Sequence, residues 1–194
     1  WAQNQAHAEG REESRLSARG KKVLVIGGGD TGSDCVGTAI RQGALQVRQI
    51  EILPKPASER ADDNPWPQWP KVLRSSSSHE EGCERRWQLQ TVRFTGDQNT
   101  VTAAEVVPIT WQTAPDGRMQ PISSSQKPER LDCDLVFLAL GFLKTDRAEL
   151  LQKLNLDESA PVFQAGDCVL GPSLVVRAIA DGIRIADHIQ QQIF

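Results

Sequence analysis

The sequence predicts an α/β fold in which a parallel sheet is combined with an antiparallel β-meander. A glycine-rich segment separates an apolar run from a helical pattern over residues 22–53, which is typical of a βαβ unit. Turn residues interrupt a period-two pattern over residues 87–119, and a helical pattern follows a Gly-Asp turn near the end of the chain. With 194 residues, the chain is long enough for one or two domains.

The first predicted βαβ unit begins with Val23–Ile26, a short β-branched run bounded by lysines and glycines. Such a run suits a strand that is buried on both faces of a parallel sheet. From Ser33 to Gln42 apolar residues recur at helical spacing, and Gly43 is well placed to end that helix. A second strand is expected over Val47–Leu53.

Between the first strand and the helix lies a match to the pattern G-x-G-x-x-G, formed by Gly27, Gly28, Gly29, Asp30, Thr31 and Gly32. Gly27 permits the tight turn, Gly29 has no side chain to obstruct a pyrophosphate, and Gly32 lets the helix pack closely on the strand. The amides at the helix start would then bind the phosphates. The flanking strand and helix favour a Rossmann-like dinucleotide site over the alternative, a glycine-rich turn without a ligand.

The choice of dinucleotide depends on charged residues beyond the second strand. Lys55 and Arg60 could pair with the 2′-phosphate of NADPH, although both could equally be solvated loop charges. Glu51 lies near the spacing at which NAD-type sites hold the ribose hydroxyls, but the apolar residues after it place it inside the predicted strand. The sequence therefore favours NADPH and leaves NADH open.

Other segments are predicted from local patterns. Residues 1–20 are expected to form a lead-in helix or linker, and the proline-rich segment 54–70 an extended, packed loop that no helix can cross. Ser75–Ser78 marks the start of a short helix. A hairpin set is expected over Trp87–Met119, with turns at Gly96-Asp97 and Asp116-Gly117, and a buried strand over residues 134–142.

The end of the chain contains a second candidate site. A strand over Val162–Ala165 would lead into the turn Gly166-Asp167, and a helix is expected from about Ser173 to Gln191. A Gly-Asp turn after a strand can place its carboxylate against a ribityl or ribose hydroxyl, while the amides of the following helix stabilise a reduced flavin. A turn that only caps a helix explains the same residues equally well.

Composition limits the classes of function. The formal net charge is −3 with both signs mixed, so nucleic-acid and membrane-surface binding are not expected. The longest strongly apolar stretch, Leu135–Leu143, is too short to cross a bilayer. The cysteines are far apart, which argues against disulfides and metal clusters and favours a cytoplasmic setting. No spacing suggests a catalytic nucleophile, and His79 with Cys83 does not make a zinc site.

These motifs carry a resemblance to the small (β) subunit family of glutamate synthase, a branch of the FAD- and NAD(P)-binding pyridine nucleotide-disulfide oxidoreductases. The resemblance rests on Val25–Cys35, on the Trp-Pro segment Asn64–Pro70, on Ser76–Gly82 and on Ala165–Cys168 with the segment 173–179 that follows. The Trp-Pro segment is not a general Rossmann feature. The chain opens on Trp1 and contains a single methionine, so we expect a fragment of a longer parent.

The resemblance implies an NADPH-dependent flavin oxidoreductase. In the family, electrons pass from NADPH to FAD and through iron–sulfur clusters to a large subunit that makes glutamate from glutamine and 2-oxoglutarate. Residues 21–143 would be the nicotinamide domain and residues 144–194 the returning end of a truncated three-layer FAD domain. The implied cofactor contacts are the glycine motif for the pyrophosphate, Ala139 and Gly141 near the nicotinamide, and Gly166, Asp167, Ser173, Leu174 and Val175 for FAD.

The chain also departs from the family pattern. It has no cysteine-rich cluster region and only one G-x-G-x-x-G motif, so the first FAD-binding βαβ unit is missing. We therefore expect the chain alone to be colourless and inactive. The alternatives are a related flavin and iron–sulfur NAD(P)H oxidoreductase subunit, or a nucleotide-binding fragment without activity of its own.

Overall fold

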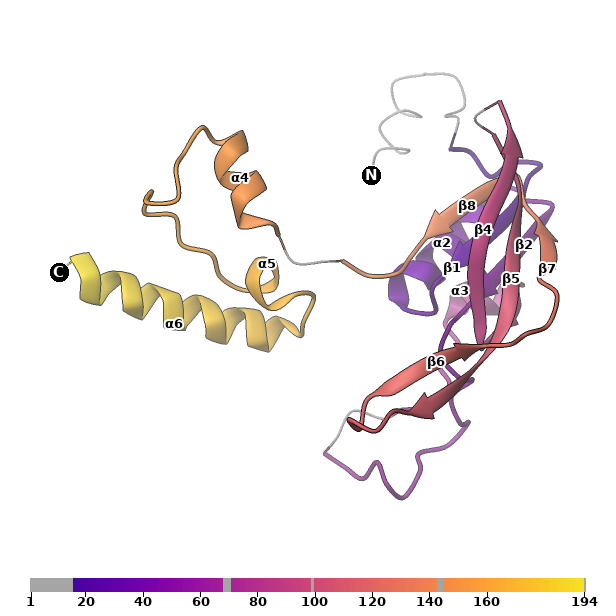
Figure 1. Ribbon diagram of the computed structural model, residues 1–194, viewed down its shortest axis with the longest axis horizontal. Helices are drawn as coiled ribbons and strands as arrows, with labels where there is room; N and C mark the ends of the chain where they lie inside the picture. Colours follow the sequence, from indigo (N-terminus) through magenta and orange to yellow (C-terminus); the bar gives the residue numbers. More distant parts are fainter. Residues whose placement is uncertain (1–15, 68–70, 99, 143–144, 194) are drawn as a thin grey trace. The chain divides into compact units, whose positions relative to one another are not determined.

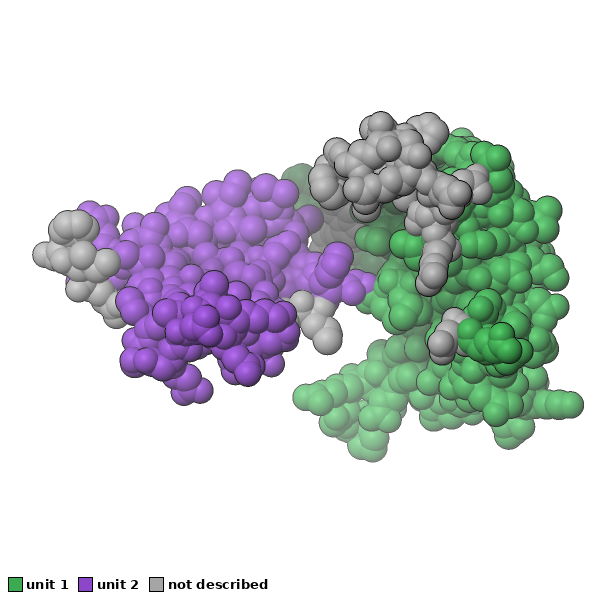
Figure 2. All heavy atoms as spheres, turned by 90° about the horizontal axis from the view of Figure 1, so that it is seen from above, with its two compact units in different colours: residues 1–140 green, residues 141–194 purple. Residues whose placement is uncertain are grey.

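The computed structural model describes residues 16–67, 71–98, 100–142 and 145–193. The chain divides into two compact units, residues 1–140 and residues 141–194, which Figure 2 shows in different colours. Within the described ranges, no helix is both long and apolar enough to cross a bilayer.

Unit 1 is built on a parallel sheet with the strand order β3-β2-β1-β8 (Figure 1). Its strands are β1 (Lys22–Ile26), β2 (Gln46–Ile50), β3 (Glu84–Arg86) and β8 (Leu135–Leu138). β1 lies in the middle, where Lys22 pairs with Gln46 and Ile26 with Ile50 on one side. On the other side Val23–Ile26 pairs in parallel with Leu135–Leu138. The apolar run that predicted a doubly buried strand is thus a central strand of this sheet, as expected.

Two helices follow strands of the parallel sheet. Helix α2 (Asp30–Arg41) begins directly after the glycine turn, and α3 (Ser77–Glu80) precedes β3. Val36 and Ala39 of α2 pack with Val23 and Val25 of β1 in one core cluster, so α2 covers one face of the sheet. The helix ends as predicted at Gly43, whose positive φ of 83° lets its amide donate to the Ile40 carbonyl.

An antiparallel layer covers the opposite face. It contains β4 (Leu89–Asp97), β5 (Thr100–Thr113), β6 (Met119–Ser123) and β7 (Glu129–Asp132). β5 pairs with β4, β6 and β7, and the hairpin turns lie where the sequence predicts them. Leu24 of β1, Ile50 of β2 and Val106 of β5 belong to one buried cluster, which joins this layer to the parallel sheet. Unit 1 therefore has three layers: helices, parallel sheet and antiparallel sheet.

Unit 2 consists of helices α4 (Arg147–Lys153), α5 (Asp167–Leu170) and α6 (Val175–Ile193) among its described residues. The carboxylate of Asp181 on α6 is buried and accepts hydrogen bonds from the Gly166 amide and the Arg184 guanidinium. These two bonds lower the pKa of Asp181, so it stays charged. The turn before α5 is thereby fixed to α6.

Several predicted elements need correction. The strand expected over Val162–Ala165 is wrong, because this segment pairs with no strand among the described residues of unit 2. The second strand ends at Ile50 and not at Leu53, since its neighbour β1 has no further residue to pair with it. The predicted strand over 134–142 is limited to Leu135–Leu138.

The proline-rich loop and the chain start also differ from expectation. No helix crosses the described part of residues 54–70, as predicted, but Trp66 is 84% exposed and does not pack. Residues 16–20 form turns and not the end of a helix, and Ala18 is fully buried against the β1–α2 layer. The rest of the predicted lead-in segment, and Trp69, lie outside the described residues.

Candidate functional site

The glycine turn joins β1 to α2 at the carboxyl edge of the parallel sheet. Gly27 has a φ of 119°, and a Cβ there would stand 2.1 Å from the carbonyl oxygen of Ala139 at the end of β8. A Cβ on Gly32 would stand 2.3 Å from the Gly27 oxygen. The turn therefore requires glycine for backbone conformation at Gly27 and for close helix packing at Gly32, the two roles that the sequence assigns.

Gly29 occupies a different environment. It is the N-cap residue of α2, its φ of −79° is ordinary, and nothing lies within 4 Å of where its Cβ would be. No side chain caps the helix, and the amides of Asp30, Thr31 and Gly32 have no acceptor among the described residues. Open space in front of unpaired N–H groups at a helix start suits an anionic phosphate group. A dinucleotide fits this part of the chain.

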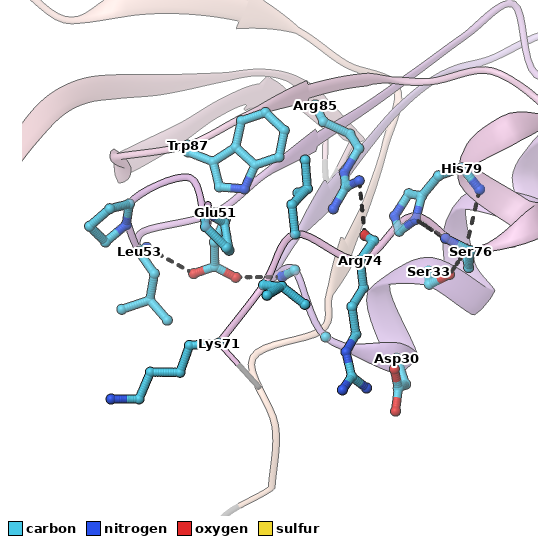
Figure 3. A pocket seen from close by; sticks show the side chains of 16 residues that line it. Asp30, Ser33, Glu51, Leu53, Lys71, Arg74, Ser76, His79, Arg85 and Trp87 are labelled. Atoms are coloured by element: carbon cyan, nitrogen blue, oxygen red, sulfur yellow. Dashed lines mark hydrogen bonds between the residues drawn. The ribbon is translucent and has the colours of Figure 1, made fainter. Parts of the chain in front are cut away.

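A pocket of about 470 Å³ opens beside the turn (Figure 3). One wall comes from the turn and the first residues of α2, and the others come from segments after β2 and around α3 and β3. Its size lies in the usual range for small-molecule sites. The charged and aromatic side chains that line it are Asp30, Glu51, Lys71, Arg74, His79, Arg85 and Trp87.

Glu51 is one of the residues that line this pocket. It directly follows β2, and its carboxylate accepts hydrogen bonds from the Gly28 amide (2.5 Å) and the Leu53 amide (3.0 Å). The interpretation of Glu51 as a residue inside the strand is therefore wrong, because β2 stops one residue earlier. Its position is the one from which an acid can reach the ribose hydroxyls of a dinucleotide.

The proline-rich loop brings basic residues to the pocket from a part of the sequence that the motif does not predict. Ala57 forms a parallel bridge with Val72, and the buried side chain of Asn64 accepts a hydrogen bond from the Lys71 amide (2.8 Å). The loop thus folds back so that Lys71 and Arg74 line the pocket. The spacing of residues in the sequence does not reveal that an irregular loop folds back in this way.

Lys55 and Arg60, the predicted 2′-phosphate ligands, do not line the pocket. The ammonium of Lys55 lies 5.2 Å from the centroid of the Trp87 ring, which does line it, and Arg85 approaches the same ring at 5.1 Å. Arg60 donates to the Asn64 carbonyl inside the loop (3.1 Å). The structure therefore places Lys55 beside the pocket wall and Arg60 in the loop.

His79 and Gln49 connect the pocket to the glycine turn, and the sequence does not single out this connection. The His79 ring is hydrogen-bonded to Ser76 and to Gln49, and Gln49 donates to the Gly27 carbonyl. Burial lowers the pKa of His79 and the nearby Arg85 guanidinium lowers it further, so the imidazole is neutral at pH 7.

The remaining predicted site residues are Ala139, after the last strand of unit 1, and residues of unit 2. Ala139 lies against Gly27, where its amide donates to the Ile26 carbonyl (2.7 Å), while Gly141 begins unit 2 with a φ of 84°. In unit 2 the Gly166 amide already donates to Asp181, and the Asp167 carboxylate accepts from the Ser173 hydroxyl (2.9 Å). Leu174 and Val175, at the start of α6, are exposed.

The predicted flavin contacts are therefore engaged largely within unit 2. The Gly166 amide and one Asp167 oxygen are each hydrogen-bonded to a residue of this unit. Ser173 also lines a hollow of about 500 Å³ in unit 2, together with Leu170, Arg177 and Asp181.

The chain is similar in sequence to small chains of glutamate synthase. It is 43% identical to glutamate synthase [NADPH] small chain of Mycobacterium tuberculosis over 86% of this chain and 36% of that protein. It is 36% identical to glutamate synthase [NADH] of Saccharomyces cerevisiae over 91% of this chain and 9% of that protein. The resemblance found in the motifs is confirmed, and the chain spans about a third of the length of the small chain that it matches.

A solved structure of Mycobacterium tuberculosis FprA in complex with NADPH shares the fold. The TM-score is 0.60 with 12% identity, and the match covers 91% of this chain and 53% of FprA. The family model for pyridine nucleotide-disulphide oxidoreductases matches residues 2–182, which is most of the sequence. This chain belongs to the pyridine nucleotide-disulphide oxidoreductase family.

Proposed function

We propose that this chain is the dinucleotide-binding part of an NADPH-dependent oxidoreductase of the glutamate synthase small-subunit type. The observation that carries the proposal is the open space at Gly29 in front of the unpaired amides of Asp30, Thr31 and Gly32. The pyrophosphate would bind there, and the nicotinamide would extend along the carboxyl edge of the sheet toward Ala139. The bound nicotinamide supplies the hydride, so the chain needs to provide only binding and orientation.

The proposal for the full-length parent goes further. Its FAD would accept the reducing equivalents, iron–sulfur clusters in a segment outside this sequence would carry them onward, and a large subunit would use them to make glutamate. The sequence similarity to proteins named as small chains of glutamate synthase supports this assignment. We propose a cytoplasmic location on the same basis, with no role for nucleic acid or membrane.

Selection of NADPH would depend on Lys71, Arg74 and Arg85 around the pocket. An arginine can bind a 2′-phosphate through two parallel hydrogen bonds, and a lysine adds a further positive charge. These side chains replace Lys55 and Arg60 in our proposal because they line the pocket beside the glycine turn. NADH remains a second candidate, favoured by the Glu51 carboxylate at the end of β2.

Calorimetric titration of the 194-residue chain with NADPH and NADH tests the proposal. Gly29→Val should weaken NADPH binding by roughly tenfold or more, since its side chain would project into the phosphate position. Gly182→Val is the matched control, because Gly182 lies on α6 and also has nothing within 4 Å of its Cβ position. Unchanged affinity in the Gly29 variant would show that the turn is not the binding site.

The same titration separates the two coenzymes. Arg74→Gln should weaken NADPH binding and leave NADH binding unchanged, because only NADPH carries the 2′-phosphate. Glu51→Gln should weaken NADH binding and favour NADPH, since it removes a negative charge near the 2′ position. If the wild-type chain prefers NADH and Arg74→Gln affects both coenzymes equally, NADH becomes the assigned coenzyme.

A further inference from the structure

The buried amide side chain of Gln49 is hydrogen-bonded to the glycine turn. Gln49 on β2 is 2% exposed, and its Nε2 donates to the carbonyl oxygen of Gly27 at 2.9 Å. Its Oε1 lies 2.9 Å from Nε2 of His79. A Cβ on Gly32 would meet both the Gly27 oxygen and Gln49 Nε2, at 2.3 and 2.8 Å, so the first turn of α2 packs directly on this contact.

The hydrogen bonds determine which nitrogen of His79 carries the proton. The Ser76 amide donates to Nδ1 (3.2 Å), and a backbone amide can only donate, so Nδ1 is the acceptor. Nε2 therefore carries the hydrogen and donates to Gln49 Oε1. This in turn orients the Gln49 amide group correctly, because the Gly27 carbonyl can only accept.

His79 is held in place by the start of α3. His79 occupies position N3 of a capping box, three residues after the N-cap Ser76. Glutamate or glutamine is usual at position N3. The Ser76 hydroxyl also contacts the hydroxyl of Ser33 in the first turn of α2. Two hydrogen-bonded connections thus start at α3 and its N-cap. One leads from His79 through Gln49 to Gly27, and the other leads from Ser76 to Ser33 of α2. Figure 3 shows the contacts among Ser33, Ser76 and His79.

We propose that His79 is a positioning residue for dinucleotide binding. Acting through Gln49, its neutral imidazole fixes the Gly27 carbonyl and with it the turn whose amides receive the pyrophosphate. The inference rests on the proposed function, because it assigns a role in the same site. It differs from a role as a phosphate ligand, in which a charged imidazolium would contact the coenzyme directly.

The surrounding charges favour the neutral role. The cations that line the same pocket already supply attraction for phosphate groups, and another positive charge beside Arg85 is unfavourable. Glu81 of α3 is engaged by Arg41 of α2, and Glu84 of β3 by Arg48 of β2. The other charged groups that line the pocket with His79 are Asp30, Glu51, Lys71, Arg74 and Arg85.

Two substitutions at His79 separate its two hydrogen bonds. His79→Asn keeps an acceptor near the Nδ1 position for the Ser76 amide but is too short to reach Gln49. His79→Gln places an amide donor near the Nε2 position and also satisfies a capping box. We expect NADPH affinity in calorimetry to fall about fivefold in the Asn variant, because this loss corresponds to the net free energy of one hydrogen bond. The affinity of the Gln variant should stay near that of the wild type.

Ser77→Ala serves as the control, because Ser77 is exposed on the same helix and does not line the pocket. Thermal melting checks that each variant is folded. If Gly29→Val abolishes NADPH binding while His79→Asn binds as well as wild type, the inference about His79 fails and the proposed function stands. If the wild-type chain binds no dinucleotide, the proposed function fails and this inference fails with it.

Two further measurements do not depend on the Asn variant. Ring ¹⁵N chemical shifts of His79 at pH 7 should show the neutral form with hydrogen on Nε2, and any other protonation state would overturn the inference. Between pH 7.5 and 5.5, the ratio of wild-type to His79→Gln affinity should not rise on acidification. A rising ratio would identify a charged imidazole that binds the coenzyme, and would also overturn it.

Discussion

Gly27 combines two constraints that rarely coincide. Its φ of 119° lies in the region that favours glycine, and its Cβ position is occupied by the backbone of Ala139 at 2.1 Å. Backbone cannot move aside as the end of a flexible side chain can. Gly29, two residues later, has an ordinary φ and open space. The same motif therefore contains two glycines that the fold requires, Gly27 and Gly32, and one, Gly29, that the fold alone does not require.

We expect Gly27→Ala to lower the free energy of unfolding by about 3 kcal/mol, the sum of backbone strain and a forced displacement of β8. Gly82→Ala is the matched control, since Gly82 has a nearly equal positive φ of 115° but nothing within 4 Å of its Cβ position. It should cost only about 1 kcal/mol. Urea unfolding measures both, and equal losses would contradict the role of the Ala139 contact.

The glycine turn and the packing roles of Gly27 and Gly32 could be predicted from the sequence because they depend on residues that are close together in the chain. Gln49 and His79 could not be assigned this way. They lie on different elements, and only the packing of α3 against α2 and β2 brings them together. The basic side chains of the pocket present the same difficulty, since an irregular loop delivers Lys71 and Arg74 to it.

The layers of unit 1 are joined by polar contacts as well as by the apolar core. Arg86 on β3 donates two hydrogen bonds to Glu129 on β7, both at 2.7 Å. This bidentate pair connects the parallel sheet to the antiparallel layer at its edge. The hydrogen bond from Arg86 lowers the pKa of Glu129, so the carboxylate remains charged to a lower pH than a free glutamate.

A double-mutant cycle with Arg86→Gln and Glu129→Gln should give a coupling energy of about 0.5–1 kcal/mol at pH 7 in urea unfolding, because both side chains are partly exposed. A group whose folded pKa is lowered contributes stability above its unfolded pKa, near 4.3 for glutamate. The coupling should therefore disappear as the pH falls through the lowered folded value. Coupling that persists at pH 2 would contradict the assignment.

Strands could be predicted from the sequence where their residues are buried on both faces of the sheet, or where buried and exposed residues alternate. β1 and the β4–β5–β6 hairpins follow from such patterns, and their turns contain the expected glycines. β7 was not predicted from the sequence, because Leu131 is the single buried residue of this strand. The strand expected at Val162–Ala165 failed for the opposite reason: its apolar residues suit a strand, but no neighbouring strand in unit 2 provides hydrogen-bond partners.

Each unit of the chain has its own internal contacts. Both apolar core clusters of unit 1 lie within residues 18–139, and every residue that lines the pocket beside the glycine turn lies between Gly28 and Trp87. Unit 2 presents several large apolar side chains to solvent along α6, with Val175 74% and Val176 68% exposed. Unit 1 thus contains both of its core clusters and this whole pocket, whereas unit 2 leaves apolar surface uncovered.

Removal of residues 141–194 should leave the NADPH affinity and the thermal transition of unit 1 unchanged, because no part of its core or pocket is lost. The truncated chain should bind less of the fluorescent dye ANS than the full chain, since the exposed apolar residues of α6 are gone. Calorimetry, circular dichroism melting and dye fluorescence measure these effects. A clear loss of NADPH affinity would instead place Gly141 or its successors in the site.

The contact between Gly27 and Ala139 also bears on biosynthesis. The dinucleotide turn lies near the start of unit 1, yet the strand that supports it, β8, is the last of that unit to leave the ribosome. A nascent chain that ends before β8 has the full glycine motif without the backbone that closes over it. If this turn binds the coenzyme as we propose, we expect capture only late in translation, once residue 139 has emerged.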